Sequence, residues 1–162
     1  MKIKINKAFT LIEILIVISI IGILTSLAVV SYTTSQKQAR DVERKSDLSQ
    51  YRTALENYAN THNSFYPIRR SEVETHAVML CDSGYTEHLE IKPCPNDPKY
   101  DEDKTDSPLY HYLSSTIGTT YVLWANSETK TDKFWVVCSN GQSGYKLIID
   151  FDSSSCPNTF DK

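Results

Sequence analysis

The sequence predicts an α+β protein in which a long N-terminal helix packs by its second half on a small antiparallel β-sheet. Three observations support this fold class. A membrane-length apolar stretch lies near the N-terminus, a proline-free amphipathic stretch follows it, and four runs of strand-forming residues occupy the C-terminal third. A chain of 162 residues has room for one modest domain beside the apolar segment.

The apolar stretch runs from Phe9 to Val30, and Glu13 is its only charged residue. As a helix it is about 33 Å long, enough to cross a hydrocarbon core of about 30 Å. An ordinary signal peptide is the alternative, because "LTSLAVVSY" loosely supplies a cleavage site, although its apolar run is usually shorter. Basic residues flank the stretch on both sides, so charge orients it only weakly.

The helical pattern continues beyond the apolar stretch. No proline occurs between Phe9 and Tyr66, and Gly22 is the only glycine there. We therefore expect one helix from about Phe9 to about Asn60, closed by "NTHNSFYP". The face expected to be buried carries Ala39, Val42, Leu48, Tyr51, Leu55 and Tyr58, and the polar positions include Lys37, Arg40, Arg44, Arg52 and Glu56.

The rest of the chain predicts a sheet. Ser71 and Glu74 have capping-box spacing and suggest a short helix, and residues 81–108 form a long connecting loop. Four runs then predict an antiparallel meander, with the amphipathic half of the long helix covering one face. They are "LYHYL", "TYVLWA", "FWVVCS" and "YKLIIDF".

Four cysteines lie in the domain and none in the long helix. An even count in loop-rich surroundings favours two disulfides formed outside the cytoplasm. We favour Cys81 with Cys94 and Cys138 with Cys156, because each pair closes a local loop; the other pairings and four free thiols stay open. Oxidised cysteines would place the domain outside and the lysine-rich N-terminus inside. Zinc is disfavoured because no Cys-x-x-Cys pair occurs.

Other chemistry has little support in the sequence. The net charge is −3, and without the three lysines of residues 1–8 it is −6, so nucleic-acid binding is not expected. "GQSG" is read as a hairpin turn rather than a nucleophile elbow, so no catalytic residue is expected. Two acidic clusters could hold a structural calcium ion, but a solvated acidic loop is favoured and no cofactor is expected. These clusters are Asp97, Asp101, Asp103 and Asp106, and Asp150 with Asp152.

The N-terminal segment "KAFTLIEILIVISIIGILTSLAVVSY" resembles that of type IV prepilins and of the pseudopilins of type II secretion systems. The later "SGYTEHLEIKPCPNDP" faintly resembles a loop of major pseudopilins. The resemblance implies the pilin fold, cleavage by a prepilin peptidase between Ala8 and Phe9, and methylation of the new amine on Phe9. Ala8 stands where the family usually has glycine. Val30 stands where many members have a kinking proline, so a straighter helix is expected.

The resemblance also implies a role for Glu13, namely pairing with the Phe9 amine of a neighbouring subunit. A charge among lipid-facing residues costs roughly 2.5–3.5 kcal/mol or more, so a carboxylate kept there calls for a reason. Two alternatives remain open. One is a contact within the chain one turn away, and the other is a carboxyl group kept protonated by the lipid.

We therefore expect a structural subunit of a type IV pilus-like or type II secretion pseudopilus filament. Residues 1–8 are the leader, 9–31 the transmembrane and assembly helix, and 32–162 the extracytoplasmic domain. The implied partners are prepilin peptidase, other copies, minor pilins or pseudopilins, and an inner-membrane assembly platform. Before assembly the chain would cross the cytoplasmic membrane once, with its N-terminus inside. The alternatives are a membrane-anchored extracellular binding domain on a helical stalk and an anchored hydrolase.

Overall fold

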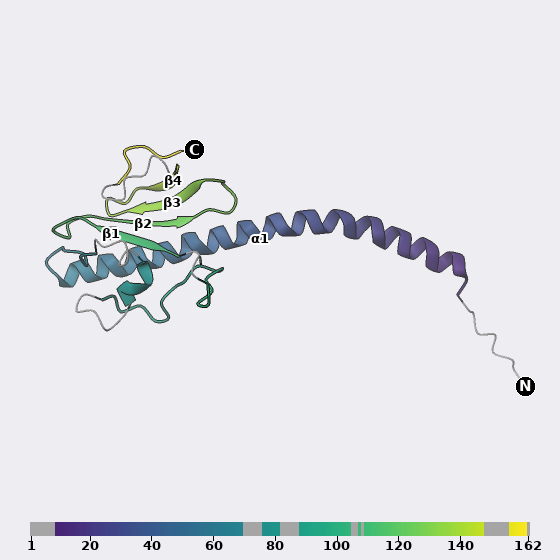
Figure 1. Cartoon of the computed structure of the whole chain (residues 1–162), viewed down its shortest axis with the longest axis horizontal. Coiled ribbons are helices and arrows are strands. Elements are labelled where there is room, and N and C mark those ends of the chain that lie inside the picture. Colours follow the sequence, from purple (N-terminus) through teal and green to yellow (C-terminus); the bar gives the residue numbers. More distant parts are fainter. Residues whose placement is uncertain are drawn as a thin grey trace, which may run out of the picture. The chain divides into compact units, whose positions relative to one another are not determined.

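The computed structural model describes residues 9–69, 76–81, 88–104, 107, 109–147 and 156–161, and for residues 27–30 the backbone alone. The chain divides into two compact units, Met1–Lys37 and Gln38–Lys162. The first unit contains the apolar part of the long helix. The second contains the rest of that helix and the whole sheet (Figure 1).

Helix α1 runs from Leu11 to Thr61, which confirms the single long helix expected from the sequence. It ends in a turn in which the N–H of Ser64 donates to the carbonyl of Ala59 at 2.9 Å. Asn63 and Ser64 have positive φ angles of 55° and 65° there, a conformation that cannot continue a right-handed helix. Pro67 follows in an extended segment.

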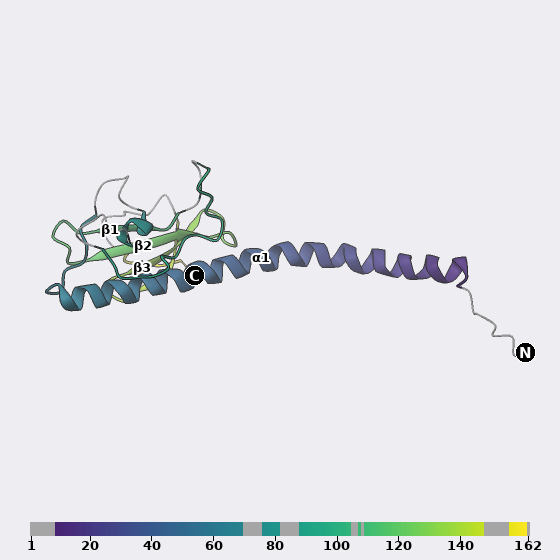
Figure 2. The same ribbon diagram turned by 90° about the horizontal axis from the view of Figure 1, so that it is seen from below.

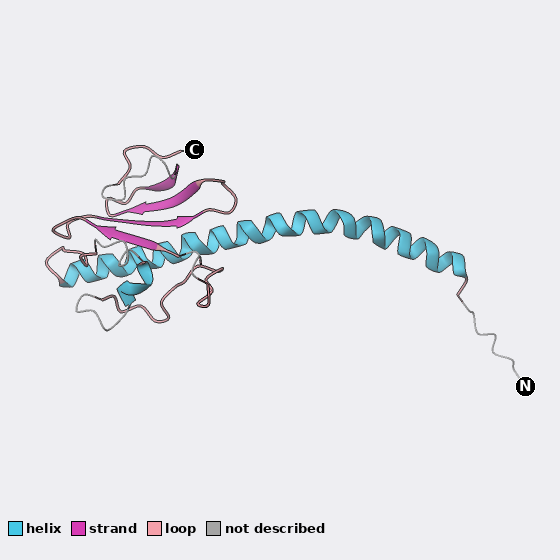
Figure 3. Ribbon diagram, viewed as in Figure 1, coloured by secondary structure: helices cyan, strands magenta, loops and turns pink. Residues whose placement is uncertain are grey.

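The sheet is a four-stranded antiparallel meander in the order β1-β2-β3-β4, as the sequence predicts (Figure 3). Its strands are β1 His111–Ser114, β2 Tyr121–Asn126, β3 Lys133–Cys138 and β4 Ser143–Leu147. Short turns connect all four, and Gly141 takes a φ of 88° in the β3–β4 turn. "GQSG" therefore lies in this turn and at the start of β4. The end of the predicted fourth run, residues 148–151, lies outside the described residues.

The second half of α1 packs on one face of the sheet, and Figures 1 and 2 show the two side by side. Leu48, Tyr51 and Leu55 are fully buried from the helix. They share one core with side chains that alternate along the strands, including Tyr112, Tyr121, Leu123 and Val137. Burial in this contact stabilises the folded state by roughly 1.5–3 kcal/mol for each large apolar side chain.

The opposite face of the sheet has its own smaller core. Val122, Trp124, Val136 and Cys138 form it, with the C-terminal Phe160 packed against them. Gly144 is needed there, because a Cβ atom at this position would lie 2.6 Å from the Phe160 ring. The C-terminal segment is also tied to β4 by the N–H of Asp161, which donates to the carbonyl of Tyr145 at 2.8 Å.

The expected burial along α1 is wrong in part. Ala39 and Val42 are exposed, Tyr58 is only half-buried, and Arg44 is buried instead of solvated. The buried positions follow a three-and-four spacing whose first two members are charged. They are Asp41, Arg44, Leu48, Tyr51, Leu55 and Ala59. The hydropathy pattern does not predict the burial of Asp41 and Arg44, because their charged partners lie in loops far along the chain.

The expected connection between helix and sheet is confirmed only where the structure describes it. A short 3₁₀ helix, η2, covers Ala77–Cys81. Residues 88–104 are loop without helix or strand. The proposed capping pair Ser71 and Glu74 lies outside the described residues.

Candidate assembly and processing site

The N-terminus of α1 carries the two residues that the resemblance assigns to assembly. Phe9 lies just before the helix and is 81% exposed, and Glu13 lies in its first turn. Ala8, on the leader side of the expected cleavage point, lies outside the described residues. The assigned roles of Ala8, Phe9 and Glu13 therefore remain predictions.

Glu13 is engaged by Thr10 in a reciprocal capping box. The Thr10 N–H and hydroxyl donate to Glu13 Oε2 at 2.8 and 2.7 Å, and the Glu13 N–H donates to Thr10 Oγ1 at 3.3 Å. Such a cap satisfies N–H groups that have no partner within the helix. It uses only one carboxylate oxygen, since Glu13 Oε1 bonds to no described residue. A second donor therefore has an acceptor available at the same carboxylate.

The apolar part of α1 leaves its side chains exposed. From Leu11 to Leu24 the large apolar side chains are 50–83% exposed. By length and composition helix α1 could cross a membrane, a test that an N-terminal signal sequence also passes. Its hydroxyl groups are satisfied within the helix, because Ser19 donates to the Leu15 carbonyl and Ser26 to the Ile23 carbonyl, both at 2.7 Å. Satisfied hydroxyl groups suit an apolar solvent.

A buried ion cluster ties the second half of α1 to two loops. The Arg44 side chain is only 3% exposed, and its Nε and Nη2 donate to the two Asp97 oxygens at 2.6 and 3.0 Å. Nη1 donates to Asp41 at 2.8 Å, and Nη2 lies 2.8 Å from Glu128. Three carboxylates from the helix, the 88–104 loop and the β2–β3 turn thus meet one guanidinium group. We call Asp41, Arg44, Asp97 and Glu128 the Arg44 cluster.

The cluster holds two of its carboxylates, those of Asp41 and Glu128, in the ionised form. Burial raises the pKa of Asp41, but N–H groups of Glu128 and Thr129 and hydroxyls of Thr129 and Ser127 outweigh it and lower the pKa to about 2. The side chain of Arg40, which donates to Glu128 at 2.7 and 2.8 Å, lowers the pKa of that carboxyl group. Both acids are therefore charged throughout the physiological range, and each has a cationic or N–H partner.

This cluster corrects the view of Asp97 as part of a solvated acidic loop. Asp97 is 4% exposed and is paired with Arg44. Asp101, a second member of the calcium candidate, lies within 2.5 Å of Lys104. Within the described residues no group of three or more histidine, cysteine, aspartate or glutamate side chains is arranged to hold a metal ion. Asp106, Asp150 and Asp152 lie outside them.

The four cysteines form the two disulfides that the sequence analysis favoured. Cys81–Cys94 joins η2 to the following loop, with Cα atoms 6.0 Å apart. The Tyr51 hydroxyl donates to the carbonyl of Pro95 at 2.8 Å, next to Cys94. This disulfide therefore fixes the start of the loop that places the Asp97 side chain against Arg44.

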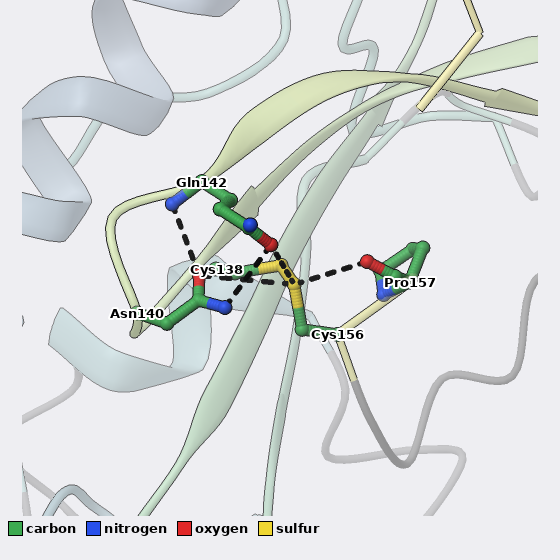
Figure 4. The surroundings of a disulfide bond; sticks show 5 residues. All are labelled: Cys138, Asn140, Gln142, Cys156 and Pro157. Atoms are coloured by element: carbon green, nitrogen blue, oxygen red, sulfur yellow. Dashed lines mark hydrogen bonds between the residues drawn. A yellow bond between two sulfur atoms is a disulfide. The ribbon is translucent and has the colours of Figure 1, made fainter. Parts of the chain in front are cut away.

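Cys138–Cys156 joins β3 to the C-terminal segment, with Cα atoms 5.7 Å apart. Figure 4 shows the bridge beside the β3–β4 turn, where Asn140 Nδ2 donates to Gln142 Oε1 at 3.1 Å. The Gln142 N–H donates back to Asn140 Oδ1 at 3.0 Å. The turn and the C-terminal segment are thus held together at one edge of the sheet.

A long helix with an exposed apolar N-terminal half, followed by a disulfide-bonded antiparallel sheet, is consistent with a membrane-anchored single-pass protein. Residues 3–29 match the prokaryotic N-terminal methylation motif. This match, at the head of such a helix, supports membership of the type IV pilin and pseudopilin family and points to a structural protein processed as a prepilin. No curated protein and no solved structure matches the chain.

The sequence analysis missed two sets of polar partners. Thr10 was readable, because Thr-x-x-Glu is the sequence pattern of a capping box. No comparable sequence pattern marks Asp41 or Glu128. Their partners lie far along the chain, since the Asp41 carboxylate accepts from the N–H of Glu128 at 2.9 Å.

Proposed function

We propose that the chain is the structural subunit of a type IV pilus-like or type II secretion pseudopilus filament. The observation that carries the proposal is a 51-residue helix whose N-terminal half is apolar, exposed and headed by the methylation motif. Exposed apolar surface of this extent needs lipid or other apolar helices around it. Membrane insertion meets this need before assembly, and packing against copies of the same helix meets it afterwards.

Glu13 is proposed to set the register between copies. Cleavage after Ala8 creates a cationic amine on Phe9. Glu13 Oε2 is used by the Thr10 cap, and Oε1 is left to accept from the Phe9 amine of a neighbouring copy. Pairing removes two charges that are costly in apolar surroundings, so it favours the one axial position at which they meet.

The two disulfides support an extracytoplasmic position for the domain. We accordingly propose residues 1–8 as a cytoplasmic leader, 9–31 as the membrane and assembly segment and 32–162 as the exported part. Prepilin peptidase, further pilins or pseudopilins and an inner-membrane assembly platform are the proposed partners.

The test uses cells that express the full chain together with a prepilin peptidase and its assembly machinery. Mass spectrometry of the membrane fraction should find a mature N-terminus at Phe9 with one added methyl group. Electron microscopy of sheared material should find filaments that contain the chain. The control is a Phe9→Ala variant with an unchanged leader. Its mature N-terminus, measured in the same way, shows whether the chain is also cleaved at other positions. A mature chain that starts after Ser26 or Ala28 would instead identify an ordinary signal peptide.

A further inference from the structure

The β3–β4 turn contains a chemically labile pair of residues. Asn140 is followed by Gly141, and this is the only Asn-Gly pair in the sequence. Both residues are exposed, so water and dissolved bases reach them. Gly141 has a φ of 88°, a conformation that other residues rarely adopt, so the turn itself requires the glycine. The requirement of the turn therefore places the labile pair on the surface of the domain.

The reaction to which this pair is prone is deamidation. Asparagine is a thermolabile residue, and a following glycine has no Cβ atom to shield its backbone nitrogen. The Gly141 nitrogen attacks Cγ of Asn140, gives its proton to a base from the solvent and forms an N–Cγ bond. The Cγ–Nδ2 bond breaks, and Nδ2 takes up a proton and leaves as ammonia. Water then opens the cyclic imide to aspartate or isoaspartate.

The backbone of the turn opposes this attack. The N–H of Gly141 donates to the carbonyl of Cys138 at 3.1 Å, and the N–H of Cys138 donates to the carbonyl of Gln142 at 2.9 Å. For the attack, the peptide plane between Asn140 and Gly141 must rotate until its nitrogen faces the side-chain carbon. That rotation breaks the bond from Gly141 to Cys138. The reaction therefore proceeds only from an opened turn.

The side-chain amide of Asn140 is held at both of its polar atoms by one residue. Its Oδ1 accepts from the N–H of Gln142 at 3.0 Å, and its Nδ2 donates to Gln142 Oε1 at 3.1 Å (Figure 4). These two bonds fix the plane of the amide and with it the direction in which Cγ can be approached. They also hold the leaving nitrogen in place.

The Cys138–Cys156 disulfide packs against the same two amide groups. Cys156 Sγ lies 3.9 Å from Asn140 Oδ1 and also 3.9 Å from Gln142 Oε1. The bridge joins the end of β3, where the turn starts, to the C-terminal segment. The turn is therefore harder to open while the disulfide is intact.

We propose that Asn140 is a deamidation site whose reaction is slowed by the closed turn, the Gln142 side chain and the Cys138–Cys156 disulfide. Gln142 is a positioning residue, because it holds the reacting amide and takes no part in bond formation. The reaction adds one negative charge to the turn and puts a carboxylate oxygen in place of the Nδ2 donor. A chain whose turn has opened is thereby marked permanently. The inference does not depend on the filament proposed above.

Deamidation of the purified full chain in detergent tests the site. The chain is incubated at mildly alkaline pH, and mass spectrometry of the peptide that contains Asn140 measures the rate. The folded, oxidised parent should react at least about tenfold more slowly than the same chain denatured in urea, because the turn opens only rarely. Equal rates in the folded and denatured chains would overturn the slowing by the fold. A denatured chain that does not deamidate would overturn the site itself.

Two variants test the part played by Gln142. Gln142→Leu keeps a side chain of similar size without an acceptor, and it should raise the rate in the folded chain about fivefold, the effect of one hydrogen bond. Gln142→Glu keeps an acceptor and should react at the rate of the parent. In urea all three chains should react equally, which assigns the difference to the folded state. Equal rates for the two folded variants would overturn the role of Gln142.

Two double variants test the part played by the disulfide. Cys138→Ser with Cys156→Ser should raise the rate at Asn140 about tenfold, toward that of the denatured chain. Cys81→Ser with Cys94→Ser removes the other bridge and is the matched control, so its rate should stay within about twofold of the parent's. Equal acceleration in both would show that general unfolding opens the turn, and would overturn the local role of Cys138–Cys156. An unchanged rate in the first double variant would overturn that role as well.

Discussion

Residues 11–37 and 38–61 belong to the same helix, yet their apolar side chains have opposite surroundings. In the first part, Leu11 to Leu24 keep at least half of each large apolar side chain exposed. In the second part, Leu48, Tyr51 and Leu55 are completely buried by the sheet and its loops. The more apolar part of the helix is thus the less buried one.

The difference teaches that burial is decided by what the rest of the chain supplies. The four strands and the 88–104 loop provide partners for residues 38–61. An exposed apolar surface as long as the first part is stable only in lipid or against other apolar helices. The two parts therefore differ in role: the first carries the proposed assembly, and the second stabilises the domain.

Each part also keeps a charge in apolar surroundings and treats it differently. Glu13 is exposed and uses one oxygen in a local cap, so its carboxylate retains capacity for another partner. Arg44 is buried, and three carboxylates already surround it. Removing either charge should therefore affect different properties of the protein.

The largest expected effect is the loss of filaments in Glu13→Val. The variant should enter the membrane at least as well as the parent, because a cost of roughly 2.5–3.5 kcal/mol disappears. Assembly should fail, since each interface then contains an unpaired amine. Membrane abundance and filament yield are measured on one strain. Thr10→Val is the control, because it removes the cap partner at a cost of about 1 kcal/mol but keeps the carboxylate. An equal loss of filament yield in both variants would mean that Glu13 acts only as a helix cap.

Arg44→Met should destabilise the domain by roughly 3–5 kcal/mol, because it removes the cation of the buried Asp41 and Asp97 carboxylates, while Glu128 keeps Arg40 and Lys99. Membrane insertion should be unchanged. Lys37→Met, an exposed lysine in the first part of the helix, should change the free energy of unfolding by less than about 0.5 kcal/mol. Denaturant midpoints of the full chain in detergent provide the measurement. Similar midpoints for both variants would contradict a stabilising role for the cluster.

Leu48→Ala and Leu15→Ala compare the two parts with the same chemical change. Leu48 is fully buried, so its truncation should cost about 2–5 kcal/mol in the free energy of domain unfolding. Leu15 is 52% exposed and touches no part of the sheet core, so its truncation should leave domain unfolding unchanged. Far-UV circular dichroism against denaturant compares them. A large effect of Leu15→Ala on domain unfolding would contradict the division of tasks.

The smallest effect is the acid dependence of stability. The pKa of Asp41 is about 2 in the folded chain and about 3.8 when unfolded, so its contribution is full above about pH 4 and is lost as pH falls toward 2. The loss amounts to roughly 2 kcal/mol. Unfolding of Asp41→Asn should depend less on pH in this window. His111, whose pKa burial lowers to about 4, titrates mainly at higher pH and is common to both proteins. If the free energy of unfolding of the parent and of Asp41→Asn changed in parallel with pH, the stabilising role assigned to the Asp41 carboxylate would be contradicted.

Most of the fold was readable from the sequence, because local patterns determine helices and strands. The proline-free stretch predicted α1 within about two residues at either end, and four β-rich runs predicted the meander and its order. The cysteine pairs followed from their short separations of 13 and 18 residues. The methylation motif and the single apolar-segment carboxylate were likewise visible, as was the Thr10 cap that went unnoticed.

Only the tertiary structure decided which charged side chains are buried and which apolar ones are exposed. The Arg44 cluster joins residues 53 and 87 positions apart, and nothing in the helix sequence distinguishes Arg44 from a solvated arginine. Val42 has the residue type of a core position but lies off the stripe that faces the sheet. Periodicity reports how side chains are distributed around one helix. Which of those sides meets another element depends on partners that are brought close only when the whole chain has folded.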